Sequence, residues 1–319
     1  MSTTHPGPRT GIEVAGSSPS QKVPAARPRR RRNLRVVLFC FALVAPVVLI
    51  RVFTAGYPMV QTAVTSLQND NPTQGPATWA GFDNYTYLAE NPQIQGSLFF
   101  TAVFAVVSTL LEIVIGLALA VLLNQKFRFR RLARAVNLLP WAIPAVVAGV
   151  AFKFALDPQY GVIAGLLNLV GFDGVSWLSE VNPARVSVIG VNVWRNAGFV
   201  AVLLLAALQT IPGELYEAAQ VDGANAWGQF RRITLPLVMP VVLSAGMFML
   251  IWQVASFDLV LAMTGGGPGT ATSVLGYSAY VIGFQNFNFG RSAAVAMVLL
   301  VFVCIIGTVF SLARRRYEK

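Results

Sequence analysis

The sequence predicts an all-α integral membrane protein with six transmembrane helices and with both termini in the cytoplasm. Hydrophobic residues make up 55% of the 319-residue chain and charged residues only 12%, about half the charged fraction of an average soluble domain. Six apolar runs are each near the length of about 20 residues that a bilayer requires. Lysine and arginine are concentrated in alternate polar segments, a distribution that marks cytoplasmic loops.

The six expected spans follow the apolar runs, and an even number of spans places both termini on one side of the membrane. Their approximate boundaries are 35–56, 96–124, 134–156, 186–209, 236–263 and 290–313. Four of their prolines are expected to kink the helices, which membrane proteins tolerate where neighbouring groups satisfy the freed carbonyls. These prolines are Pro46, Pro140, Pro144 and Pro240.

The meaning of the net charge of +11 depends on where the lysines and arginines lie along the chain. Of the 24 lysines and arginines, 8 lie in residues 1–35, 5 in residues 126–134 and 4 in residues 314–319. Residues 54–97 contain none. The charge therefore indicates topology and contact with anionic membrane lipid. Nucleic-acid binding is not expected.

The chain ends and the external segments have distinct compositions. Residues 1–34 are rich in proline, serine and arginine and are expected to form a disordered basic cytoplasmic tail. Residues 35–316 form the expected transmembrane domain, and residues 317–319 a short C-terminal tail. No small-residue cleavage site follows the first apolar run, which favours an uncleaved span over a secretory signal. The stretch YGVIAGLLNLVG is too short to span a membrane and is expected to form an interfacial helix.

Several kinds of chemistry are excluded by composition. The only histidine, His5, lies in the tail, which removes histidine-based metal sites and Ser-His-Asp triads from the core. Cys40 and Cys304 each lie inside an apolar run and suggest neither a disulfide nor a redox pair. The glycine run MTGGGPGTATS lacks the Gly-Lys-Ser/Thr ending of a nucleotide-binding loop. We therefore expect no catalytic residue, no metal and no bound cofactor in this chain.

A polar segment, residues 211–236, separates the fourth and fifth spans and is expected to face the cytoplasm as a helix–turn–helix. Glu214 and Glu217 would lie near the positive end of the first helix dipole. Gly223 fits a helix stop, and Pro236 would open the fifth span after a second short helical stretch. From the residues alone, a docking surface and an amphipathic loop resting on lipid headgroups both remain open.

The spacing within this segment resembles a family signature. It has Glu-Ala-Ala, three residues, Gly, nine residues, Ile, one residue and Leu-Pro, as in the cytoplasmic signature of the permease subunits of binding-protein-dependent ABC importers. The segment ELYEAAQVDGA is similar to the corresponding segment of the carbohydrate subfamily, the maltose and glycerol-3-phosphate type. So are FDNYTYL, LNQKFRFR, LLPWAIPAVVA, DPQYGVI, NVWRN and FDLVLAMTGGGPGTAT. The resemblance covers residues 35–316 and excludes the basic tail.

The resemblance implies a type I ABC importer permease fold with a cytoplasmic coupling loop at residues 211–236. In the family this loop docks to an ATPase subunit. The implied docking residues are Glu214, Glu217, Ala218, Ala219, Asp222, Gly223, Ile233, Leu235 and Pro236. The implied partners are a second permease subunit, an extracytoplasmic solute-binding protein and two ATPase subunits that bind ATP and Mg²⁺. A heterodimer of different permeases is preferred to a homodimer.

The expected function is import of a sugar by alternating access in the cell membrane. Side-chain amides, hydroxyls and aromatic rings suit a sugar, although helix packing explains the same residue types. The candidate pathway residues are Asn192, Trp194, Asn196, Trp252, Gln253, Ser256 and Phe257.

Four ionisable residues within the spans are also candidates: Glu112, Lys153, Arg195 and Asp258. We expect Lys153 and Arg195 to reach a membrane interface and Asp258 to be structural. For Glu112, a partner within the bundle and contact with solute remain open.

Alternatives remain for the solute and for the mechanism. A glycerol-3-phosphate, glycerophosphodiester or polyol importer would differ in solute only, and Arg195 leaves a phosphate-bearing solute open. An amino acid is less expected. An ion-coupled secondary transporter or a channel would need no ATPase. A membrane-embedded enzyme is disfavoured because the chain lacks core histidines and paired-carboxylate motifs.

Overall fold

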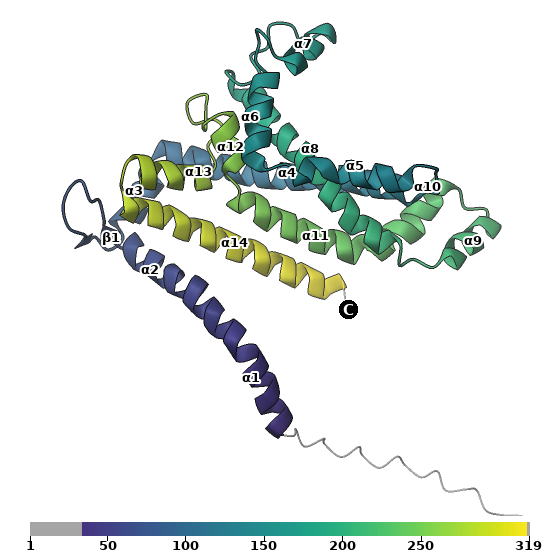
Figure 1. Cartoon of the computed structure of the whole chain (residues 1–319), viewed down its shortest axis with the longest axis horizontal. Helices are drawn as coiled ribbons and strands as arrows, with labels where there is room; N and C mark the ends of the chain where they lie inside the picture. Colours follow the sequence, from purple (N-terminus) through teal and green to yellow (C-terminus); the bar gives the residue numbers. More distant parts are fainter. Residues whose placement is uncertain (1–33, 318–319) are drawn as a thin grey trace, which may run out of the picture. The chain divides into compact units, whose positions relative to one another are not determined.

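The computed structural model describes residues 34–317 (Figure 1). His5, nearly all of the expected tail over residues 1–34, and the last residues of the chain therefore lie outside the described residues. Contacts between Cα atoms divide the chain into two units, Met1–Thr54 and Ala55–Lys319. Each unit is described by itself.

The described part of the first unit is apolar helix. It comprises α1 (Leu34–Arg51) and the start of the π-helical turn η1 (Val52–Gly56), and Pro46 lies inside α1. Large apolar side chains such as Phe39 and Phe41 are exposed, as expected for a helix that is apolar on all sides. The helical stretch Leu38–Ser66 is long and apolar enough to cross a membrane, and it continues beyond the expected boundary at residue 56.

The second unit is a helical bundle with one small hairpin. Its helices are α2 (Tyr57–Ser66), α3 (Asp83–Glu90), α4 (Pro92–Asn124), α5 (Arg130–Ala142), α6 (Ala145–Ala155), α7 (Val162–Leu169), α8 (Val181–Leu208), α9 (Gly213–Val221), α10 (Ala226–Gln229), η2 (Phe230–Thr234), α11 (Leu235–Ala255), α12 (Asp258–Met263), α13 (Leu275–Tyr280), η3 (Val281–Gln285) and α14 (Phe289–Tyr317). Strands β1 (Gln68–Asn69) and β2 (Thr78–Trp79) are antiparallel, with Gln68 opposite Trp79. In Figure 1, α3, α13 and β1 lie at one end of the bundle and α9 and α10 at the other.

The chain is a mostly helical, multi-pass membrane protein. Among the described residues, five helical stretches are long and apolar enough to cross a membrane, or six if α5 and α6 form one broken span. The short stretch expected to lie at the interface is helical, as α7. The helices bury one face and leave large apolar side chains on the other. On α4, for example, Phe100 and Phe104 are buried whereas Phe99 and Val114 are exposed.

Helices α5 and α6, which cover the expected third span, are bent by 90° relative to each other. Ile143 and Pro144 have extended backbone, with ψ of 128° and 138°. A residue before proline is pushed away from helical conformation, which explains the break at this position. By contrast, Pro46, Pro140 and Pro240 lie inside helices that continue through them.

The fifth span differs from its expected boundaries of 236–263. One helical stretch runs from Ala226 to Ala255, so the second short helix of the coupling loop is continuous with the span. The helix ends where Ser256 becomes extended (φ −84°, ψ 131°), and α12 restarts with Asp258 in its first turn. An acidic residue suits a helix start, but the apolar run continues through this break and conceals it.

The spans pack closely where a glycine lies at the contact between two helices. Helix α4 runs along α8, which also packs against α5 and α11. A Cβ atom at Gly198 of α8 would collide with the carbonyl oxygen of Asn137 of α5. The Asn137 side chain donates a hydrogen bond of 3.0 Å to the Gly198 carbonyl. The two helices therefore meet backbone to backbone, which fixes the first half of the broken span against α8.

We expect Gly198→Ala to destabilise the protein by about 1–3 kcal/mol, because the added methyl group overpacks this contact. Gly190→Ala on the same helix is the matched control, since a Cβ there meets no atom within 4 Å. Thermal unfolding of the detergent-solubilised variants measures the difference. Equal melting temperatures for the two variants would contradict the close approach of α5 and α8.

Candidate functional site

The loop after α8 forms the expected helix and turn. Pro212 is the N-cap of α9, and the helix ends at Asp222. Gly223 has a φ of +78°, a conformation that glycine adopts without steric cost. The Gly223 N–H donates to the Gln220 carbonyl (3.0 Å) and the Ala224 N–H to the Ala219 carbonyl (2.8 Å). This pattern is a Schellman closure, so the helix stop expected at Gly223 is confirmed.

The surface of α9 is open. The helix buries none of its residues, and Glu214, Glu217 and Ala218 are exposed. Val221 is 88% exposed, and Trp227 of α10 is 68% exposed. Large apolar groups are therefore exposed beside acidic ones at one end of the bundle, and exposed apolar groups in a polar rim mark interaction surfaces.

Two contacts hold this loop against the bundle. The Tyr216 hydroxyl lies 2.9 Å from the Thr234 hydroxyl, and Thr234 is buried. The Asn225 side chain caps α10 by accepting from the Gly228 N–H at 2.8 Å. A cavity of about 300 Å³ lies beneath, lined by Tyr216 and by the end of α4. The sequence reasoning missed Tyr216, whose signal was its place as the only aromatic residue in α9.

The remaining residues of the signature lie where the loop returns to the bundle. Ile233 lies in η2 and is half-buried, and Leu235 and Pro236 form the first turn of α11. The signature is thus divided between an exposed helix with its turn and the start of the fifth span.

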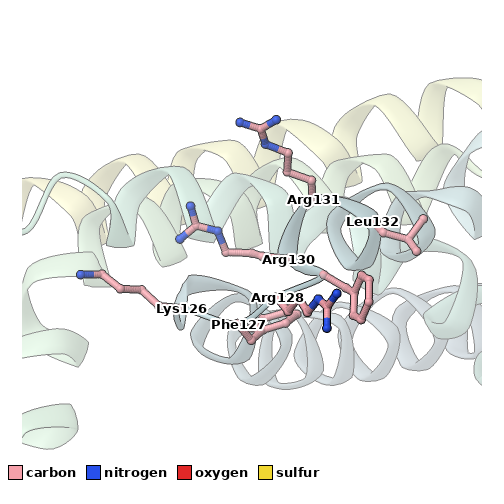
Figure 2. Close-up of a pocket in the computed structure, with 7 residues that line it drawn as sticks. Lys126, Phe127, Arg128, Arg130, Arg131 and Leu132 are labelled. Carbon is pink, nitrogen blue, oxygen red and sulfur yellow. The ribbon is translucent and has the colours of Figure 1, made fainter.

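A basic loop lies between α4 and α5 at the same end of the bundle. Figure 2 shows Lys126 of this loop and Arg130 and Arg131 of the first turn of α5, and the loop and this turn together line a hollow of about 640 Å³. The Arg134 guanidinium donates to the Leu123 carbonyl at 3.1 Å and ties α5 to the end of α4. The cations therefore cluster beside the coupling loop, as the charge distribution predicts.

The interior of the bundle contains a polar cluster centred on Glu112 of α4, which is fully buried. Its Oε1 accepts three hydrogen bonds from amide groups. The donors are Asn192 (3.3 Å) and Asn196 (3.2 Å) of α8 and Gln253 (2.6 Å) of α11. Asn196 also donates to the Asn192 side chain at 3.1 Å. We call these four residues the Glu112 cluster; it joins three spans.

Arg195 lies beside this cluster and is bound within the protein. Its Nε donates to the Ile143 carbonyl at 3.1 Å and its Nη1 to the Asn196 Oδ1 at 3.2 Å. The break before Pro144 places the Ile143 carbonyl within reach of Arg195, and Arg195 is half-buried; that it reaches a membrane interface stays a prediction. Lys153 is exposed on α6.

Two cavities adjoin the cluster and share the side chains of Phe248 and Trp252. The larger, of about 350 Å³, is lined by Ala145, Arg195, Phe248, Ile251, Trp252, Ala255, Ser256 and Asp258. The smaller, of about 30 Å³, is lined by Trp141, Asn196, Phe199, Phe248, Met249 and Trp252. The rings form a continuous aromatic wall, in which Phe248 lies 6.2 Å from Phe199 and 6.0 Å from Trp252 between centroids.

The candidate pathway residues fall into three groups. Asn196, Trp252 and Ser256 line the cavities. Asn192 and Gln253 lie in the Glu112 cluster.

The other two pack elsewhere. Trp194 meets Phe152 edge-on at 5.0 Å, and Phe257 stacks on Tyr280 at 6.0 Å. Neither lines the two cavities. The sequence reasoning missed Phe248, which precedes Trp252 by one helical turn.

Comparison with known proteins gives a consistent result. The family described as "Binding-protein-dependent transport system inner membrane component" matches residues 112–319. The chain is 34% identical to the sulfoquinovosyl glycerol transport system permease protein of Agrobacterium fabrum, over 88% of this chain and 91% of that protein. It is also 34% identical to the trehalose/maltose transport system permease protein of Thermococcus litoralis, over 77% of this chain and 83% of that protein.

Solved structures show the same fold. A chain of a bacterial alginate ABC transporter, in complex with an alginate pentasaccharide-bound periplasmic protein, superposes with a TM-score of 0.77 at 24% identity. The match covers 91% of this chain and 99% of that one. A second structure, of a bacterial ABC transporter that imports alginate, gives a TM-score of 0.74 at 25% identity, over 90% and 98% of the two chains.

We expect Gly223→Ala to loosen the end of α9, because a side chain at positive φ costs about 1–2 kcal/mol. Gly213→Ala is the control, since it adds the same atoms at the other end of α9, where a Cβ meets nothing within 4 Å. The measurement is cleavage by a glutamate-specific protease after Glu214 and Glu217. Cleavage of the Gly223 variant should be roughly five- to thirtyfold faster, and an unchanged rate would contradict the proposed role of this turn.

Proposed function

The chain belongs to the family of inner membrane components of binding-protein-dependent transport systems, and from that premise we propose that it is the permease subunit of an ATP-driven sugar importer. The observation that carries the proposal is the larger cavity, in which Trp252 lies beside Ser256 and Arg195. Aromatic rings pack against the C–H faces of a sugar, and polar groups bind its hydroxyls. The family relatives named for trehalose/maltose and for sulfoquinovosyl glycerol support a carbohydrate.

The charges of the larger cavity disfavour a phosphate-bearing solute. Arg195 already donates to two protein groups, the Ile143 carbonyl and the Asn196 side chain. Asp258 lines the same cavity, so the two formal charges there cancel. A phosphate group needs unshared cationic donors, which supports a sugar or polyol over glycerol-3-phosphate.

The exposed α9 helix is proposed to dock into an ATPase subunit on the cytoplasmic side. Glu217 and Ala218 are exposed there, and the Gly223 closure and the Tyr216–Thr234 contact hold the helix in place. A rigid docking helix transmits movement of the ATPases to the spans that it joins. ATP binding would then favour one of two permease conformations, which is alternating access biased by differential binding.

The proposed complex contains further subunits. It comprises a second permease, preferably a different chain, together with two ATPases that bind ATP and Mg²⁺ and an extracytoplasmic binding protein. Both termini are proposed to be cytoplasmic, with residues 35–316 as the permease domain. This chain would then carry no enzymatic activity and bind no cofactor of its own. An ion-coupled transporter or channel would leave the exposed α9 without a partner.

We expect Glu217→Lys to abolish recovery of the ATPase subunits with the permease, because the reversed charge would face the docking cleft. Glu90→Lys is the control, since Glu90 is equally exposed but ends α3 at the opposite end of the bundle. Co-purification from membranes that express the whole importer is the measurement. Undiminished ATPase recovery with normal transport would contradict docking through α9.

We expect Trp252→Ala and Asn196→Ala to reduce sugar uptake at least about tenfold without loss of assembly, the first through lost contact with the solute and the second through the lost contact that holds Arg195. Trp194→Ala is the control for Trp252, because the two rings are similarly exposed, at 43% and 48%, but only Trp252 lines the cavities. Uptake of radiolabelled trehalose, maltose or sulfoquinovosyl glycerol by cells that carry the importer is measured. Normal uptake by both cavity variants would place the solute site elsewhere.

A further inference from the structure

Among residues 38–312, Glu112 is the only charged residue that is buried. It lies near the middle of α4, a helix whose other buried residues are apolar, small or hydroxyl-bearing. A buried carboxyl group is costly within a membrane unless protein groups hydrogen-bond to it. The three amide donors satisfy this requirement, and they come from two other helices.

The arrangement controls the orientation of the amides. Each amide has a donor end and an acceptor end, and Glu112 attracts the donor ends of Asn196 and Gln253. The acceptor end of Asn196 is therefore directed to the guanidinium of Arg195, at 3.2 Å. A carboxyl group that touches neither cavity thus sets the direction of side chains that line both, since Asn196 lines the smaller and Arg195 the larger.

A purely structural cluster would use its polar atoms fully. Here the Oε2 of Glu112 and the Oε1 of Gln253 are buried and have no hydrogen-bond partner among the described residues. An unsatisfied buried group typically costs about 1–3 kcal/mol, so apolar residues in place of all four members of the cluster would stabilise the packing better. The cluster is therefore explained by what it orients more than by the stability that it adds.

We propose that Glu112 is a positioning residue for the solute cavity: it holds Asn196 and, through Asn196, the guanidinium of Arg195 in the orientation that receives the solute. The inference rests on the proposed function for what enters the cavity. It assigns to α4, which lines neither cavity, a direct part in the selectivity of the importer.

The decisive readout is the amount of sugar imported per ATP hydrolysed by the reconstituted complex with its binding protein. Glu112→Leu should lower this ratio about tenfold, while ATP hydrolysis stimulated by the loaded binding protein stays within about twofold of wild type. A solely structural role would instead lower both activities together, in proportion to the amount of assembled complex. Glu112→Gln keeps an acceptor oxygen for the three amides and should restore the ratio to within about threefold of wild type.

Two further comparisons make the test specific. Ser108→Ala is the matched control, because Ser108 lies one turn before Glu112, is equally buried and has no hydrogen-bond partner among the described residues. It should behave as wild type. In an Asn196→Leu background, Glu112→Leu should cause less than about twofold further loss, since the effect passes through Asn196. Equal losses in both backgrounds, or a wild-type ratio for Glu112→Leu, would overturn the proposal.

If the Glu112→Leu variant does not assemble into the importer complex, the Glu112→Asp variant tests the positioning role instead. It keeps a buried carboxyl group but withdraws it by one methylene from the amides, so the ratio should fall about three- to tenfold; a wild-type ratio would overturn the proposal.

A solute-independent measurement separates the two proposals. In a chain without Cys40 and Cys304, the rate at which N-ethylmaleimide labels Ser256→Cys reports the cavity wall. We expect Glu112→Asp to change this rate at least about threefold and Ser108→Ala to leave it unchanged. If the wild-type complex imports none of the three sugars, the sugar proposal fails, and an unchanged labelling rate would overturn the positioning role as well.

Discussion

Hydrocarbon offers no hydrogen bonds, so a polar group within the bundle is costly unless it finds a partner in the protein. This constraint explains why the ionisable residues Arg195 and Glu112 lie beside hydrogen-bonding groups of neighbouring helices. The break before Pro144 places the Ile143 carbonyl beside Arg195, which donates to it. The carboxyl group of Glu112 draws three amides from α8 and α11. The polar contacts that satisfy the backbone at the broken span are thus the same contacts that shape the cavity.

The two candidate sites are joined by the helices that carry them. Helix α8 runs from the Glu112 cluster to Leu208, immediately before the α9 loop. The return path is one helical stretch from Ala226 to Ala255, about 45 Å long at 1.5 Å per residue. Trp227 is exposed near its first turn, and Gln253 and Trp252 lie near its last. The loop is therefore connected to the cavity wall by two continuous helices, α8 and the stretch from Ala226 to Ala255, and not by flexible linkers.

Sequence reasoning succeeded where local chemistry decides the structure. The helix stop at Gly223 depends on glycine's access to positive φ, and the break before Pro144 depends on the steric restriction that proline places on the preceding residue. Sequence reasoning failed where the rotation of a helix about its axis decides which side chains face the cavity. Trp194 and Asn196 are two residues apart in α8, yet only Asn196 lines a cavity. The partner of Arg195 was equally hidden, because it is a backbone carbonyl 52 residues away.

The continuous stretch from Ala226 to Ala255 also limits how the chain can vary in length. By composition its first residues belong to a polar loop, where insertions are usually tolerated. A single residue added at the η2 turn would rotate everything beyond it by about 100°. Trp252 would leave the cavity wall and Gln253 would leave Glu112, although neither had been replaced. The number of residues between the exposed loop and the cavity is therefore as constrained as their identity, and insertions are compatible with this architecture only before Ala226 or after Ala255.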